Sequence, residues 1–89
     1  MADGKLQEAV AQFTRALALD PKFALAYNGR GFAFLRLKQY SAAVADFDQA
    51  IRLNPAYANA YQNRSAARRA MGDCEGAEAD LAKSRTLAK

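Results

Sequence analysis

The chain has 89 residues, a formal net charge of +4 and 52% hydrophobic residues, with no His and a single Cys. Without an imidazole or a second thiol, it lacks the usual central residue of serine or cysteine hydrolases and of His or Cys metal sites, and it cannot close an internal disulfide. We therefore expect one small domain with no enzyme activity, no metal and no cofactor.

Membrane insertion is not expected from the hydropathy pattern. The sequence has no run of about 18 apolar residues that could span a bilayer. Its first residues also lack the basic and then apolar blocks of a secretory signal. We predict a soluble, cytoplasmic protein, either as it stands or as a piece of a longer one.

Five helices are predicted along the chain, because apolar residues recur three and four apart in five stretches. These stretches are residues 5–18, 24–37, 40–53, 58–71 and 74–87. Pro21 and Pro55 disfavour helical geometry in the residue before them, and Gly72 can take the left-handed conformation that closes a helix. The breaks between the helices are short, so consecutive helices should be antiparallel.

The sequence also repeats itself at an offset of 34 residues, which places Pro21 on Pro55 and Tyr27 on Tyr61. At this offset 16 of the 55 overlapping pairs are identical, and the matches fall at helical spacings. A period of this length is typical of stacked, repeated supersecondary units. Each unit here contains two of the predicted helices, so the chain is expected to be an all-α array of helical hairpins.

One complete unit carries a family pattern in Tyr27, Arg30, Gly31, Phe34, Ala43, Phe47, Ala50 and Pro55. At these spacings the unit resembles the tetratricopeptide repeat. The resemblance implies a right-handed superhelix of stacked antiparallel hairpins with about two and a half repeats. Residues 1–23 would be the second helix of a half repeat, 24–57 a full repeat, and 58–89 a full repeat that ends in a capping helix.

The repeat positions predict a core of small residues and aromatic rings. Alanines let two helices approach closely, and Tyr27, Phe34 and Phe47 fill the space between them. Cys74 aligns with Tyr40, a core-type position, so we predict that its thiol is buried.

Two arginines are predicted to form equivalent ion pairs. Arg30 and Arg64 are each followed sixteen residues later by an acid, Asp46 and Asp80. In an antiparallel hairpin that turns near residue 38, the first acid lies about level with the first arginine. A partly buried guanidinium needs such a partner, which favours two structural pairs over an anion-binding site.

The resemblance also implies a binding surface on the inner, concave side of the array, where the first helices of each unit lie. An apolar strip with hydrogen-bond donors beside it would suit a peptide or a helix of a partner protein. We therefore predict a non-catalytic interaction module, a scaffold or adaptor, with a groove formed by Leu25, Asn28, Phe32, Leu35, Arg36, Asn59, Gln62, Asn63 and Arg69.

The best-known subclass of this family grips acidic chaperone tails with a two-carboxylate clamp of Lys, Asn, Asn, Lys and Arg spread over three units. If residues 24–57 are placed first, Asn63 fits one Asn, but Asn28 replaces a Lys and Phe32 replaces the other Asn. We therefore do not expect chaperone tails to be held by that clamp.

Two alternatives concern other surfaces. The helix of residues 5–18 lacks the first helix of its own unit, so its face with Ala9, Phe13 and Ala16 is predicted to stay open and could drive self-association into a homodimer. The excess charge of +4 could attract nucleic acid. However, nine acids are spread among the bases and no surface aromatic is set up for base stacking, so nucleic acid is disfavoured.

Overall fold

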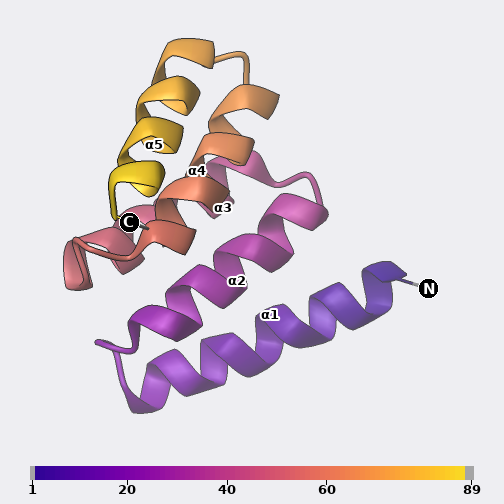
Figure 1. The fold of residues 1–89 in the computed structure, drawn as a ribbon. Helices are drawn as coiled ribbons and strands as arrows, with labels where there is room; N and C mark the ends of the chain where they lie inside the picture. Colours follow the sequence, from indigo (N-terminus) through magenta and orange to yellow (C-terminus); the bar gives the residue numbers. More distant parts are fainter. Residues whose placement is uncertain (1, 88–89) are drawn as a thin grey trace.

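The computed structural model describes residues 2–87, which form five α-helices and no strand. The helices are α1 (Ala2–Leu19), α2 (Ala24–Arg36), α3 (Tyr40–Leu53), α4 (Ala58–Ala70) and α5 (Cys74–Leu87). Each helix packs against the next along the chain, and α2 also touches α4 (Figure 1). The all-α prediction is confirmed. No helix among the described residues is both long and apolar enough to cross a lipid bilayer.

The turns between units are built alike. Asp20 and Asn54 each precede a proline, and each side-chain oxygen accepts a hydrogen bond from the backbone N–H two residues on, at 3.1 Å from Lys22 and 3.2 Å from Ala56. These turns use the side chain to satisfy backbone groups where the helix stops. As a result, α2 and α4 start at equivalent positions of the 34-residue repeat.

The turns inside the hairpins differ in one residue. Gly72 has φ 90° and Lys38, at the equivalent position, has φ 65°. Both lie in the left-handed region, which suits Gly and strains a residue with a Cβ. The Asp73 carboxylate then accepts a 2.9 Å hydrogen bond from the Gly76 N–H at the start of α5, whereas α3 begins without a side-chain cap.

The core lies between α2, α3 and α4. Phe47 has no exposed surface and packs with Ala43 and with Ala67 of α4. A Cβ added at Gly31 would come within 2.6 Å of the Phe47 ring, so the glycine lets α2 and α3 approach this closely. The large aromatic ring therefore occupies space that the missing side chain vacates.

The two predicted ion pairs are confirmed. Arg30 donates to both oxygens of Asp46 at 2.8 Å, and Arg64 donates to both oxygens of Asp80 at 2.7 and 3.0 Å. Both acids are buried, with side chains 7% and 4% exposed. Such two-point pairing satisfies a buried carboxylate and fixes the angle between two helices.

A third contact of each arginine reaches back to the preceding unit. Arg64 donates to Asp48 at 2.9 Å, and Arg30 donates to the hydroxyl of Thr14 at 3.2 Å. Thr14 and Asp48 occupy equivalent repeat positions. The arginines therefore join consecutive units as well as the two helices of one unit.

Candidate functional site

A shallow hollow lies between α2 and α4, and we refer to it as the α2–α4 hollow. It is lined by Asn28, Gly29, Phe32, Asn59 and Asn63. Both helices are the first of their units, and the turn and ion-pair geometry described above sets them side by side. Four of the five lining residues, the three asparagines and Phe32, belong to the groove predicted from the sequence.

The three asparagines of the hollow form a connected network. Asn28 is 7% exposed. It donates to Asn59 Oδ1 at 2.9 Å and to the Tyr57 hydroxyl at 3.3 Å, and its own Oδ1 accepts from Asn63 at 3.1 Å. Asn63 also donates to Asn59 Oδ1 at 3.1 Å. These bonds hold the amides in one arrangement.

The network leaves two amide groups with capacity to spare. Among the hydrogen bonds described for residues 4–87, none uses the side-chain nitrogen of Asn59 or the side-chain oxygen of Asn63. Asn59 is exposed and Asn63 half-buried. The hollow therefore offers a free donor and a free acceptor at its surface, the pair of groups that a peptide unit requires.

An apolar wall flanks these amides on the α2 side. Leu25 is 60% exposed and Phe32 is 43% exposed. The Arg36 guanidinium lies 6.0 Å from the centre of the Phe32 ring, close enough for a cation–π contact. Leu35 does not belong to this wall, because it packs against the core of Ala43, Phe47 and Ala67. The prediction that Leu35 faces the groove is wrong, since α4 covers that side of α2.

The remaining predicted groove residues lie on α4. Gln62 and Arg69 are exposed. Arg69 lines a second hollow, the α4–α5 hollow, together with Glu78, Leu81 and Arg85. The structure therefore divides the single predicted groove into two hollows on either side of α4. Sequence reasoning missed the second one because its other lining residues come from α5, the second helix of its unit.

Charge is unevenly distributed among the helices. α2 holds two arginines and α4 holds three, and neither helix contains an acidic residue. Arg30, Arg64 and Arg68 are paired with acids of α3 and α5. Among the side chains of residues 4–87, Arg36 and Arg69 form no ion pair. The face that α2 and α4 share is therefore basic.

The paired arginines do not titrate under ordinary conditions. The hydrogen bond to Asp46 raises the pKa of Arg30 above its ordinary value, against the opposing effect of burial. The hydrogen bond to Asp80 raises the pKa of Arg64 in the same way, also against the effect of burial. These guanidinium groups therefore stay charged, and their hydrogen bonds keep α2 joined to α3 and α4 joined to α5.

The predicted self-association face of α1 is partly covered. Ala9, Phe13 and Ala16 are all half-buried. A Cβ on Gly29 of α2 would overlap the Phe13 ring, so this ring packs over Gly29. Gly29 of the next unit therefore covers part of the Phe13 ring, and self-association through Ala9, Phe13 and Ala16 stays a prediction.

Cys74 corrects another expectation. Its thiol is exposed rather than buried. Cys74 is the first residue of α5, and within residues 2–87 no helix follows that could cover it. Position in the repeat therefore predicts burial only where a neighbouring unit is present.

The α2–α4 hollow presents hydrogen-bonding and apolar groups. The α2–α4 hollow is lined by amides, a glycine and a phenyl ring, none of which is a nucleophile or a general acid or base. Its amides are held in place before any ligand arrives. Such an arrangement suits recognition of a polar, extended ligand.

Comparisons with known proteins agree with this description. A family model described as TPR repeat matches residues 1–38, and one described as Tetratricopeptide repeat matches residues 24–57. Hsc70-interacting protein 1 of Drosophila melanogaster is 44% identical over 77 residues, which are 86% of this chain and 20% of that protein. The chain thus spans a fifth of the length of this curated relative.

Two solved structures have the same fold. The first TPR of Spaghetti (RPAP3), bound to the HSP90 peptide SRMEEVD, superposes with a TM-score of 0.92 at 34% identity, covering 94% of this chain and 67% of the other. The second TPR domain of human RPAP3, in complex with the HSP70 peptide SGPTIEEVD, gives a TM-score of 0.90 at 32% identity, with 97% and 72% covered.

Proposed function

Because the chain belongs to the tetratricopeptide repeat family, we propose that it is an interaction module that binds a peptide segment of another protein on the face shared by α2 and α4. The observation that carries this proposal is the α2–α4 hollow, with its ordered asparagines and the exposed Phe32 beside them. The free donor on Asn59 and the free acceptor on Asn63 would pair with the main chain of the segment. Phe32 and Leu25 would cover an apolar side chain.

The charge of this face favours an acidic segment. Both α2 and α4 lack acids, and Arg36 and Arg69 remain available beside the hollow. The peptides bound by the two RPAP3 domains, SRMEEVD and SGPTIEEVD, are acidic. We therefore take such chaperone peptides as the first candidates for this chain. They would be held without the family's two-carboxylate clamp, because Asn28 and Phe32 stand at two of its positions.

A binding assay tests the proposal directly. Fluorescently labelled SRMEEVD and SGPTIEEVD are titrated with the 89-residue chain and followed by fluorescence polarisation. Phe32→Glu should weaken binding at least tenfold, because it places a charge in the apolar wall and repels an acidic peptide. Arg15→Glu is the matched control, since Arg15 is exposed on α1 and forms no ion pair with the side chains of residues 4–87. Its affinity should stay within about twofold of the parent.

Two results would contradict the proposal. One is that neither peptide binds the parent chain. The other is that Phe32→Glu and Arg15→Glu weaken binding equally, which would mean that net charge alone attracts the peptide. Melting curves of both variants establish that each remains folded.

A further inference from the structure

The α4–α5 hollow is lined by Arg69, Glu78, Leu81 and Arg85, whose equivalents in the preceding unit lie at a contact between helices. Thirty-four residues earlier, the equivalent positions are Leu35, Val44, Phe47 and Ile51. In that unit Leu35 and Val44 pack against the core that contains Ala67 of α4. These repeat positions therefore pack against α4 in the α2–α3 unit, and they line an open hollow in the α4–α5 unit.

The chemistry of the second hollow differs from that of the first-unit surface. Three aliphatic positions, 35, 44 and 51, become charged at 69, 78 and 85. Covering these charges with an apolar helix would remove them from water without a partner, which is costly. Their counterparts in the first unit serve helix packing, whereas this hollow suits a ligand that brings opposite charge.

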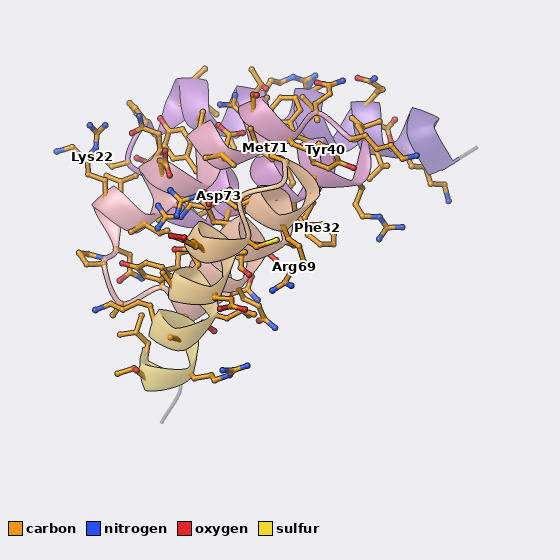
Figure 2. The ribbon with its side chains drawn as sticks, turned by 90° about the horizontal axis from the view of Figure 1, so that it is seen from above. Lys22, Phe32, Tyr40, Arg69, Met71 and Asp73 are labelled. Atoms are coloured by element: carbon orange, nitrogen blue, oxygen red, sulfur yellow. The ribbon has the colours of Figure 1, made fainter. Side chains whose placement is uncertain are left out.

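The part of α4 that separates this hollow from the α2–α4 hollow carries small exposed side chains. On α4 the exposed residues between Asn63 and the far side of the helix include Ala66 and Ala70. On α2 the equivalent positions hold Phe32 and Arg36, so α2 forms a wall where α4 has only methyl groups. In Figure 2 the side chains of Phe32 and Arg69 emerge along the same edge of the molecule. An extended chain can cross α4 at the two alanines.

The distance between the two hollows fits a few residues of peptide. Asn63 and Arg69 are six positions apart on one helix, which corresponds to about 9 Å along its axis and about 120° around it, so the path over the helix surface is about 15 Å. An extended peptide covers this path in about four to five residues. Arg69 and Arg85 both line the hollow, against one acid, Glu78, so its balance is positive.

We infer that the α4–α5 hollow binds a carboxylate of the same peptide that occupies the α2–α4 hollow, with the peptide crossing α4 over Ala66 and Ala70. This inference rests on the proposed function and extends it. Arg69 and Arg85 donate to the carboxylate, and Leu81 contacts the carbon atoms beside it. Glu78 limits the hollow to a single negative charge. The carboxylate lies about four to five residues from the peptide unit that pairs with Asn59 and Asn63.

The test combines peptide and protein changes, with SRMEEVD as the probe. Each of its two glutamates is replaced by Gln, its aspartate by Asn, and its C-terminal carboxylate by an amide, one at a time. The affinity of each peptide is measured for the parent chain, Arg69→Gln, Arg85→Gln and the control Arg15→Gln. We expect one peptide change to cost five- to tenfold with the parent and with Arg15→Gln. The same change should cost less than twofold with Arg69→Gln or Arg85→Gln, because its partner is already gone.

Glu78→Gln provides a second reading of the same site. Removing this acid should tighten SRMEEVD several-fold and leave the fully neutral version of the peptide unaffected. The Nε–Hε signals of Arg69 and Arg85 in nitrogen-15 spectra should shift with the acidic peptide only. Folding of every variant is checked by its melting curve.

The outcomes separate the two proposals. If SRMEEVD binds and Phe32→Glu weakens it, while Arg69→Gln and Arg85→Gln bind every peptide like the parent, the carboxylate site is overturned and peptide binding stands. That result would leave the hollow to a further helix. If SRMEEVD does not bind the parent chain, the proposed function fails and this inference fails with it.

Discussion

The two full units of the array each contain a buried Arg–Asp pair, but the other contacts between their two helices differ. In the α2–α3 unit, the buried Phe47 ring packs into the space beside Gly31. In the α4–α5 unit the equivalent residues are Leu81, which is half-buried, and Ser65, which is buried. There Arg68 replaces Phe34 and joins Arg64 on the same buried carboxylate of Asp80. The buried Phe47 ring therefore packs the helices of the first hairpin together, whereas two arginines on one carboxylate join the helices of the second.

This difference places the large apolar contacts in one unit and charged surface residues in the other. The α2–α3 unit supplies the large apolar contacts, and α4 completes its core through Ala67. In the α4–α5 unit, Arg69, Glu78 and Arg85 stand where the α2–α3 unit has aliphatic residues, so its outer face is polar. We therefore expect core mutations to act mainly in the first unit, and charge mutations to act mainly in the second.

The largest contrast should come from truncating equivalent core residues. Phe47→Ala should lower the free energy of unfolding by about 3–5 kcal/mol, since it removes a fully buried ring, and the half-buried Leu81→Ala by about 2 kcal/mol. Urea unfolding followed by circular dichroism measures both. Equal losses would show that the two units share the core evenly and would break the comparison.

The buried acids should show the opposite order. Asp80→Ala leaves two arginines without their partner and should cost about 3 kcal/mol, whereas Asp46→Ala leaves one and should cost about 2 kcal/mol, because each arginine still reaches solvent. Asp48→Ala is the control, since its side chain is 51% exposed, and should change stability by no more than about 0.5 kcal/mol. An unchanged melting temperature for Asp46→Ala would contradict the structural role of the pairs.

The hairpin turns offer a matched pair of smaller changes. Lys38→Gly should stabilise the chain by up to about 1 kcal/mol, because glycine has no Cβ to strain at positive φ. Gly72→Ala should destabilise by roughly 1 kcal/mol for the same reason. Thermal melts of the two variants should therefore move in opposite directions. A shift of the same sign in both would mean that the two turns are not equivalent.

The smallest expected effect sharpens the comparison at the unit boundary. Thr14→Asp should give Arg30 the carboxylate that Asp48 gives Arg64, adding about 0.5 kcal/mol. The gain should disappear in 1 M salt, where the screening length falls to about 3 Å. Thr14→Asn controls for shape and should show no salt-dependent gain. If Asp and Asn behave alike, the backward contact of Arg30 carries no electrostatic stabilisation.

Most of the fold could be predicted because its signals are local. Pro21, Pro55 and Gly72 mark three of the four breaks, and the helices end within a few residues of the predicted bounds. The Arg–Asp pairs also followed from spacing, since an antiparallel hairpin sets residues sixteen apart level with each other. These features depend on chain geometry that each unit carries within itself.

The site was harder to predict because it depends on contacts between units. Leu35 turned out to be covered by α4, and Phe13 found space over Gly29 of the following unit. Asn28 was expected as an open groove residue, but it is the buried centre of the asparagine network. The only sequence signal for the burial of Asn28 was its place beside Gly29, since a glycine allows another helix to approach α2 closely. That signal does not predict which residues of the other helix Asn28 contacts.

A nitrogen-15 NMR titration of the chain with unlabelled SRMEEVD tests the central claim most directly, because it reports on every position at once. The account predicts that the largest shifts fall on the side-chain amides of Asn59 and Asn63 and on the backbone around Phe32, with little change on the outer faces of α1 and α3. Shifts confined to those outer faces, or none at saturating peptide, would contradict the assignment of the α2–α4 hollow as the binding site.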